Sequence, residues 1–413
     1  HLPSGSNDRL FAIVGRDPRV SGEFLQAAVS AGLASAGVDV IDVGVVPTPA
    51  VAYLTDVTGA DLGVMISASH NAMPDNGIKF FARGGHKLPD TVEDEIEAHL
   101  KNAGSLPTGD AVGRIRSNHD LVEQYVSHIT STIDINLAGI TLVVDCANGA
   151  ASIVGPEIYR RLGAHVIAIH CEPTGYNINE NCGSTHMEDL VQAVVAHKAD
   201  LGIAHDGDAD RCLAVSETGE LVDGDQILAI LATSRKARGE LASNTVVATV
   251  MSNLGFTLAM QEAEIEIIAT AVGDRYVLDA MREKQLNLGG EQSGHVILAD
   301  HATTGDGILT AVQVMAEMKR ADKSLSEIAN VVTRLPQVLV NVKNVDKAAT
   351  SKPELMQAIA RVEEQLGTTG RVLLRPSGTE PVIRVMVEAA TAKEAEDSAS
   401  FLAQVVAEHC AIG

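Results

Sequence analysis

The stretch FAIVGRDPRV SGEFLQAAVS AGLASAGVDV IDVGVVPTPA VAYLTDVTGA DLGVMI, residues 11–66, indicates the fold class. Three short apolar runs rich in β-branched residues alternate in it with two longer segments rich in Ala and Leu. Such runs predict buried strands, and the longer segments predict helices between them. Strands that alternate with helices favour an α/β unit with a largely parallel sheet. The predicted strands are 11–14, 38–43 and 62–66, and the predicted helices are 21–36 and 48–55.

The same alternation returns in two further blocks, whereas the C-terminal part has a different pattern. Strand-like runs at 141–145 and 165–169 belong to the second block, and those at 245–249 and 264–269 belong to the third. After residue 338, strand-like runs, among them 382–388, are combined with two long helical segments, which predicts a small α+β domain. The expected domains are 1–116, 117–219, 220–334 and 335–413.

The composition excludes several classes of function. The 413 residues carry a net charge of −23, only 3% of them are aromatic, and Trp is absent. A chain this acidic, without a run of Lys or Arg, is not expected to bind nucleic acid or an anionic membrane. No apolar stretch reaches the ~18 residues of a membrane helix. The five Cys form no CxxC pair, so we expect free thiols and a cytoplasmic protein.

An acidic loop, Asp206-Gly-Asp-Ala-Asp-Arg211, is the clearest candidate for a metal site. Carboxylates at every second position can converge on one hard cation. An EF-hand begins in the same way, but it needs Gly where Arg211 stands, and the flanks 201–204 and 212–215 look like strands. We therefore expect a short loop between two strands that holds Mg²⁺ through Asp206, Asp208 and Asp210. The alternative is a solvated acidic turn.

A second candidate follows the predicted strand 62–66 directly. Ser67-Ala-Ser-His-Asn71 lies at a strand end, where catalytic groups collect in α/β sheets, and Asp75-Asn-Gly-Ile-Lys79 comes next. A Ser flanked by His and Asn is a candidate nucleophile. The alternative is a polar turn without chemistry.

Two further loops carry groups that suit a phosphorylated sugar. In Gly289-Gly-Glu-Gln-Ser-Gly-His295, Glu291 and Ser293 point to the same side if the chain is extended, and they could bind sugar hydroxyls. Arg375-Pro-Ser-Gly-Thr-Glu-Pro381 offers a guanidinium, hydroxyls and backbone N–H groups, which suit a phosphate dianion. The alternatives are a Gly-rich hairpin turn and a Pro-bounded turn.

Taken together, these loops predict phosphoryl transfer on a phosphorylated sugar, with one loop from each expected domain. The polar segment 177–186 is expected to be a loop near the acidic one, with Cys182 as a packed thiol rather than a nucleophile. The sequence contains no Walker A loop, GxGxxG, GxSxG or HExxH motif, so nucleotide and nicotinamide chemistry lacks support.

The four loops also resemble a known family. Residues 69–71, 206–211, 290–295 and 375–381 are similar to the four signature loops of the α-D-phosphohexomutases, in that family's order and over essentially the whole chain. The resemblance implies three α/β domains with mixed sheets and a C-terminal α+β domain, similar to the TATA-binding protein, around a central cleft. Gln292 and the segments 179–186 and 384–388 resemble the branch that acts on glucosamine phosphates.

The resemblance also implies roles for individual residues. Ser69 would carry the phosphoryl group, and the phosphoserine would bind one Mg²⁺ per chain together with Asp206, Asp208 and Asp210. Glu291 and Ser293 would bind sugar hydroxyls. The non-transferring phosphate would be bound by Arg375, Ser377, Gly378, Thr379 and Arg384. The candidates for proton transfer are Lys79 and His295, with His70 as a further candidate, and Asn71, Arg211 and Arg275 are expected in the same site.

The implied reaction interconverts glucosamine 6-phosphate and glucosamine 1-phosphate through a 1,6-bisphosphate, with a hexose 1,6-bisphosphate as primer. It would feed UDP-N-acetylglucosamine and cell-wall synthesis. The expected partner is a phosphorylated hexosamine, with no nucleic acid and no membrane, and the candidate assembly is a homodimer. The open alternatives are a phosphomannomutase/phosphoglucomutase, a metal-dependent sugar phosphatase, and a protein that only binds sugar phosphate or Ca²⁺.

The sequence departs from the family pattern at two points. The family's first strand carries Gly-x-Asp-Gly-x-Arg-Gly, and we expect this segment to precede His1, where the sequence starts. Ala72 stands where many relatives have Pro after Ser-His-Asn. Because Pro restricts the residue before it, we expect a looser loop here.

Overall fold

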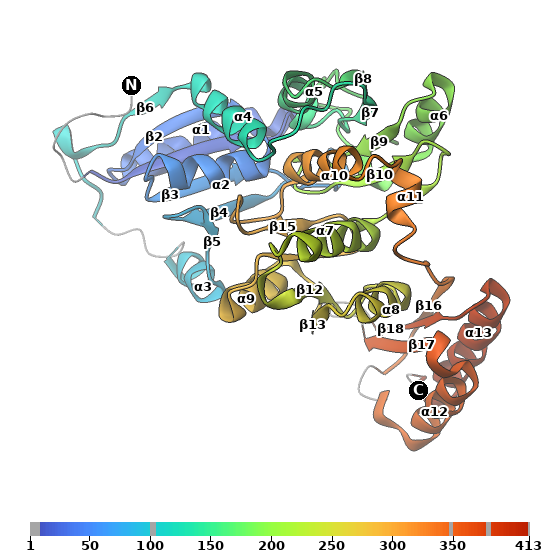
Figure 1. Ribbon diagram of the computed structural model, residues 1–413. Helices are drawn as coiled ribbons and strands as arrows, with labels where there is room; N and C mark the ends of the chain where they lie inside the picture. Colours follow the sequence, from blue (N-terminus) through green and yellow to red (C-terminus); the bar gives the residue numbers. More distant parts are fainter. Residues whose placement is uncertain (1–8, 100–104, 347–349, 377–380, 412–413) are drawn as a thin grey trace. The chain divides into compact units, whose positions relative to one another are not determined.

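The computed structural model describes residues 9–99, 105–346, 350–376 and 381–411 (Figure 1). The chain forms two compact units. The first consists of His1–Val250 and Ile265–Val331, and the second consists of Met251–Glu264 and Val332–Gly413. Within the described ranges, no helix combines the length and the apolar character needed to span a bilayer.

The first sheet of the larger unit has the strand order β5-β4-β3-β1-β2-β6. Its central strands are parallel and buried, as their apolar runs predict, while β4 and β5 pair antiparallel at one edge. Helices α1 and α2 connect the parallel strands and pack on them. The elements are β1 Phe11–Arg16, α1 Val20–Ser35, β2 Asp39–Val45, α2 Thr48–Val57, β3 Leu62–Ile66, β4 Ile78–Ala82, β5 His86–Lys87, α3 Asp90–His99 and β6 Ile115–Ser117.

Strand β6 lies in the polar stretch 114–118, where the sequence predicts the end of the first block. Ile115 pairs with Val40, so this short strand completes the first sheet and ends at Ser117, next to the expected boundary at 116. The strand lies at a sheet edge and all three of its residues are exposed. It therefore has no buried face and no apolar alternation that the sequence could have revealed.

The second sheet has the order β11-β10-β9-β7-β8. Strands β7, β8 and β9 are parallel, and β9 and β10 form an antiparallel hairpin. Helix α6 packs on β7 and β9, and α5 packs on β8. The elements are α4 Val122–Ser131, β7 Thr141–Asp145, α5 Ala151–Arg161, β8 His165–Ile169, α6 Glu188–His197, β9 Leu201–Ala204, β10 Leu213–Ser216 and β11 Leu221–Val222.

The third sheet, β13-β12-β14-β15, ends in the hairpin β14–β15. Helix α10 is buried along most of its length and contacts α4, α5 and α7, so it lies among the helices of the second and third blocks. The elements are α7 Gly224–Arg238, β12 Thr245–Thr249, β13 Glu266–Thr270, α9 Asp274–Lys284, β14 Leu288–Gly290, β15 Val296–Leu298, α10 Gly307–Ala321 and α11 Leu325–Ala329.

The smaller unit is the expected α+β domain. Its antiparallel sheet β16-β18-β17 packs against two helices around a core that includes Leu355, Val385 and Leu402. Helix α8 also belongs to this unit, because buried Glu388 accepts a hydrogen bond from the Leu254 amide (2.9 Å). The expected third domain, 220–334, includes that helix instead. The elements are α8 Leu254–Glu262, β16 Gln337–Lys343, α12 Pro353–Leu366, β17 Arg371–Pro376, β18 Val382–Glu388 and α13 Ala392–His409.

Candidate active site

Ser69 lies just beyond the carboxyl end of β3, as its position in the sequence predicts. Its φ of 52° is left-handed, a conformation that costs a non-Gly residue energy and that the surroundings must enforce. Its amide donates to the Ser67 hydroxyl (2.9 Å), and Ser67 in turn donates to Asp17 (2.7 Å). The backbone of the candidate nucleophile is therefore fixed from the end of the neighbouring strand β1.

Two side chains that sequence reasoning missed hold the same loop through its carbonyl groups. Arg19 is 1% exposed and donates to the carbonyl oxygens of Ser69 (3.1 Å) and Asn71 (2.9 Å), while its Nε donates to Asp17 (2.9 Å). The amide of Asn179 donates to the same two carbonyls, at 2.9 and 3.0 Å. Only the position of Arg19 after β1, at the same sheet edge as Ser69, could have indicated its role.

The acidic loop joins β9 to β10, so the prediction of a loop between strands is confirmed and the EF-hand alternative is excluded. Asp206, Asp208 and Asp210 are at most 5% exposed, and each offers an oxygen within 4.8 Å of the others. The Ser69 hydroxyl donates to Asp206 Oδ2 at 2.6 Å. Gly207 makes this approach feasible, because a Cβ there would lie 2.6 Å from the Ser69 carbonyl oxygen.

The donors of this loop fit a magnesium ion. The Oδ1 atoms of Asp208 and Asp210 are buried and have no hydrogen-bond partner among the described residues. Burial, with Asp210 and Asp208 nearby, raises the pKa of Asp206 well above its usual range. Buried carboxylates without enough counter-charge call for a cation, and an all-oxygen donor set suits Mg²⁺. Asp206, Asp208 and Asp210 are therefore the residues that would hold it.

Lys79 supplies part of the counter-charge from β4. Its ammonium lies 2.6 Å from Asp208 and 3.0 Å from Asp210. Burial alone would lower the pKa of Lys79, but the two aspartates outweigh burial and raise that pKa above its ordinary value. For Asp210, Lys79 and His295 likewise outweigh burial and hold the pKa well below its usual range. In this arrangement Lys79 is a fixed cation rather than a proton acceptor.

His70 and His295 are placed differently. His70 is half-buried, and its Nδ1 has no hydrogen-bond partner in the described part of the chain; burial, and then Arg211, lower its pKa. His295 is buried, with Nδ1 3.7 Å from Asp210 Oδ1 and Nε2 3.6 Å from Asp274 Oδ2. Arg211 approaches Asp206 and Asp210 to 4.0 Å. The structure thus brings all three residues to the acidic loop.

Lys87 is a further residue that sequence reasoning missed. It pairs with Asp274, and burial together with the nearby Lys79 ammonium lowers its pKa to about 8. A lysine poised near neutral pH is a typical proton carrier. No local pattern around Lys87 indicates this pKa shift, because its neighbours come from three separate segments.

The loop between β14 and β15 carries Glu291 and Ser293. Gly294 N–H donates to the Glu291 carbonyl (3.0 Å), so the segment turns between β14 and β15, as in the Gly-rich hairpin alternative, and is not extended. Glu291 instead accepts from the Gly273 amide at 3.1 Å. The Ser293 hydroxyl is buried and, among the residues described, has no partner. Both side chains thus stay candidates for sugar hydroxyls, on a turn rather than on one side of a strand.

Three arginines remain of the predicted site residues: Arg275 in the larger unit, and Arg375 and Arg384 in the smaller one. Arg275 donates to the Leu88 carbonyl (2.6 Å). Arg375 and Arg384 stand directly opposite each other on β17 and β18. Opposed like charges destabilise a strand pair unless an anion lies between them. The expected phosphate-binding residues Ser377, Gly378 and Thr379 lie outside the described residues.

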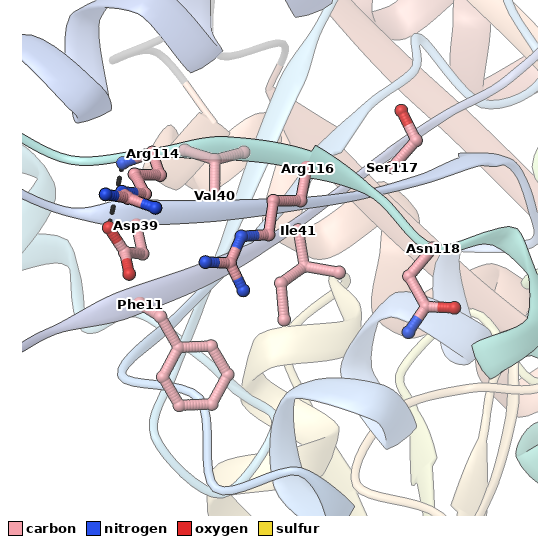
Figure 2. A pocket seen from close by; sticks show the side chains of 8 residues that line it. All are labelled: Phe11, Asp39, Val40, Ile41, Arg114, Arg116, Ser117 and Asn118. Atoms are coloured by element: carbon pink, nitrogen blue, oxygen red, sulfur yellow. Dashed lines mark hydrogen bonds between the residues drawn. The ribbon is translucent and has the colours of Figure 1, made fainter. Parts of the chain in front are cut away.

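A separate cavity of about 270 Å³ lies over β1, β2 and β6 (Figure 2). Arg114, Arg116 and Asp39 supply its charged side chains, and Phe11 and Ile41 supply the apolar part. None of its lining residues belongs to the candidate site.

The chain matches four family models from end to end. Those described as phosphoglucomutase/phosphomannomutase α/β/α domains I, II and III match residues 5–106, 123–219 and 223–335. The one described as the phosphoglucomutase/phosphomannomutase C-terminal domain matches residues 339–405.

Named relatives and solved structures agree with these matches. A phosphoglucosamine mutase from Corynebacterium jeikeium is 61% identical over 96% of this chain and 90% of its own length. A phosphoglucomutase/phosphomannomutase family protein from Burkholderia thailandensis has a TM-score of 0.81 at 25% identity, over 97% of this chain and 89% of that one. An Aspergillus fumigatus N-acetylphosphoglucosamine mutase, solved with GlcNAc-6P and magnesium, shares the fold with a TM-score of 0.70 at 21% identity, over 88% and 92% of the two chains.

The chain therefore belongs to the phosphoglucomutase/phosphomannomutase family, the phosphohexomutases, which are magnesium-dependent enzymes that transfer phosphate within a sugar. Within that family it groups with the bacterial phosphoglucosamine mutases.

Proposed function

We propose that this enzyme interconverts glucosamine 6-phosphate and glucosamine 1-phosphate and uses Ser69 as the phosphoryl carrier. The observation that supports this most is the 2.6 Å contact of the Ser69 hydroxyl with Asp206, inside a buried group of three aspartates. The 61% identity to a phosphoglucosamine mutase supports the choice of sugar.

In the proposed first step, the phosphoryl group on Ser69 Oγ moves to the free hydroxyl of glucosamine 6-phosphate. The P–O bond to Ser69 breaks, a P–O bond to the sugar forms, and the hydroxyl proton passes to a base, for which His70 and His295 are the candidates. Arg19 and Asn179 keep the Ser69 backbone in place while the bond changes. The product of this step is a 1,6-bisphosphate.

In the second step, the bisphosphate reverses its orientation and returns its other phosphoryl group to Ser69. Asp206, Asp208 and Asp210, with the phosphorylated Ser69, would hold one Mg²⁺ per chain, which neutralises charge on the transferring group. Glu291 and Ser293 would bind sugar hydroxyls. Arg375, Arg384 and residues 377–379 would bind the phosphate that is not transferred.

The proposal includes a primer and a cellular setting. A hexose 1,6-bisphosphate would phosphorylate Ser69 at the start, and the product would supply UDP-N-acetylglucosamine for the cell wall. We place this reaction in the cytoplasm, in agreement with five free thiols.

A coupled assay tests the proposal. The parent and Ser69→Ala are incubated with glucosamine 6-phosphate, Mg²⁺ and a hexose 1,6-bisphosphate. Conversion by the parent and none by the variant is expected, with glucosamine phosphate turned over faster than glucose or mannose phosphate. Faster turnover of the other sugars would contradict the assigned substrate. Release of inorganic phosphate without isomerisation would contradict the mutase reaction.

A further inference from the structure

A second group of metal-ligating side chains lies in the sheet β11-β10-β9-β7-β8, and the proposed phosphoryl transfer does not use it. Asp145 ends β7, His170 follows β8 directly, and Cys182 precedes the short helical turn Gly183–Thr185. One carboxylate oxygen, one imidazole nitrogen and the thiol sulfur all lie within 4.8 Å of one another. Three different ligand types from three segments thus meet next to the carboxyl ends of β7 and β8.

The three ligand atoms are close enough to converge on one ion. His170 Nδ1 lies 2.9 Å from Asp145 Oδ2. Ligands of a tetrahedral zinc ion are about 3.3–3.8 Å apart, given bond lengths of about 2.0–2.3 Å, so these two atoms would move slightly apart to bind one. Asp145 and Cys182 are fully buried, whereas the side chain of His170 is 26% exposed and offers a route for an ion.

The surroundings support His170 and Asp145 as metal sites require. His170 Nε2 lies 3.3 Å from Asp189, and a metal-ligating His commonly donates its second nitrogen to such a carboxylate. The amides of Ala147 (2.8 Å) and Gly183 (3.0 Å) donate to Asp145 and fix its orientation. His170 also has a φ of 45°, a left-handed conformation that presents the ring to this group at an energetic cost.

We propose that Asp145, His170 and Cys182 form a binding site for a zinc-class transition-metal ion, with water as the fourth ligand. On binding, Cys182 loses its thiol proton to solvent, and the neutral His170 ring binds through Nδ1 while Nε2–H donates to Asp189. Thiolate and imidazole ligands favour such ions over Mg²⁺, whereas the all-oxygen loop at 206–210 favours Mg²⁺. The ion would join the two ends of segment 170–182, which carries Asn179.

Cobalt absorption tests this site without reference to catalysis. The full chain is first saturated with Mg²⁺ to fill the aspartate loop and then titrated with Co²⁺. A thiolate-to-cobalt band in the near ultraviolet is expected at one equivalent, and Zn²⁺ should abolish it. Cys182→Ser should lose the band, whereas Cys171→Ser, which changes the neighbouring cysteine, should keep it.

If changing buried Cys182 prevents folding, a variant at the surface still tests the site. Asp189→Asn removes the exposed carboxylate behind His170 and should weaken Co²⁺ binding by about 10–100-fold, the usual effect of losing such a partner. Glu188→Gln, at the exposed position beside it, should bind like the parent. No band in the parent, a band that persists in Cys182→Ser, or unchanged affinity in Asp189→Asn would overturn the proposal.

Discussion

Ser69 is held in its left-handed conformation by residues that lie far from it in the sequence. Arg19 precedes it by 50 residues and Asn179 follows it by 110, and both donate to its carbonyl oxygen. Arg19 is itself fixed by Asp17 and is buried. A nucleophile must be held within a fraction of an ångström of its attack geometry, so in the proposed reaction Arg19 and Asn179 would act as positioning residues through the Ser69 backbone.

Removal of the Asn179 amide should therefore slow catalysis without unfolding the protein. Asn179 has a φ of 57°, so Asn179→Gly keeps the backbone conformation and deletes two hydrogen bonds. Two hydrogen bonds of about 1 kcal/mol each imply a fall in kcat of roughly 10–30-fold, with KM for glucosamine 6-phosphate within about twofold. Initial rates on the parent and the variant would measure both constants.

Asn181→Gly is the matched control for this change. Asn181 is exposed in the same loop and has a φ of 52°, so the substitution makes the same backbone change away from Ser69. It should leave kcat near the parent value. Equal losses in the two variants would mean that loop rigidity, rather than the Asn179 amide, supports Ser69.

His205, next to the acidic loop, should make the fold sensitive to acid. It is fully buried between the Tyr159 hydroxyl (2.7 Å) and the Arg211 carbonyl (3.0 Å), and burial lowers its pKa to about 4. The unfolded chain, with a His pKa of about 6.5, binds more protons between pH 4 and 6.5, so stability falls as the pH drops through this window. The two pKa values correspond to a loss of about 3 kcal/mol at pH 4.

Urea unfolding at pH 7, 5.5 and 4.5 would isolate this contribution. His205→Gln should be less stable than the parent at pH 7 but lose less stability on acidification. Asp306 has the opposite effect on stability: burial raises its pKa to about 6, so the folded state binds more protons below that pH and gains stability on acidification. Asp306 is present in both proteins, so its contribution cancels when the parent and His205→Gln are compared. The exposed His197→Gln should follow the parent curve, and a parallel curve for His205→Gln would disprove the assignment.

At the scale of elements, one glycine joins the hairpin β14–β15 to strand β10. Gly294 has a φ of +90°, its carbonyl accepts from the Cys212 amide (3.0 Å), and a Cβ there would lie 2.4 Å from the Cys212 carbonyl oxygen. The loop that carries Glu291 and Ser293 is thereby held against the residue that precedes β10 and follows the acidic loop. Only glycine permits both the torsion and the close approach.

Gly294→Ala should therefore destabilise the fold by more than the cost of placing Ala in a left-handed torsion. The torsion costs about 1–2 kcal/mol, and the clash with backbone adds to it. Gly239→Ala is the control, because Gly239 also has a positive φ (+72°) but no atom lies within 4 Å of the point that its Cβ would occupy. Thermal unfolding should show a larger loss for Gly294→Ala, with KM for glucosamine 6-phosphate raised only in that variant. Equal losses would contradict the proposed contact.

Elements with a buried face could be predicted, and those without one could not. The ranges of β3, β7, β8, β12 and β18 match the predicted runs residue for residue, because each run is apolar and bounded by turn residues. The exposed edge strand β6 carried no such signal.

The site residues also divide into those that the sequence could predict and those that it could not. Loops whose chemistry is contiguous, such as 206–210, were visible in the sequence, and the structure places Ser69 against them. Arg19, Asn179 and Lys87 were not visible, because each contacts at least one partner that lies 50 or more residues away. Their alignment depends on which strand ends are adjacent in the sheets, which a single sequence does not encode locally.

At the scale of the whole molecule, a net charge of −23 must coexist with an anionic substrate. The larger unit already carries the aspartate loop, so the non-transferring phosphate needs cations elsewhere. Arg375 and Arg384 of the smaller unit, proposed above to bind this phosphate, oppose each other on β17 and β18, and an anion between them would remove a repulsion of roughly 0.2–1 kcal/mol. The two units should therefore respond to different ligands.

Hydrogen–deuterium exchange can separate these responses. Mg²⁺ alone should slow exchange in 201–216, around the aspartate loop, and leave β17 and β18 unchanged. Glucosamine 6-phosphate should slow exchange in β17 and β18.

Arg384→Ala removes a charge-assisted contact of about 1.5–3 kcal/mol, so it should abolish that protection and raise KM by about 10–150-fold. Lys343→Ala, which removes an exposed cation from the same sheet, should change neither. If saturating substrate is turned over but leaves β17 and β18 unprotected, the phosphate is bound elsewhere, and the arginine pair has another role.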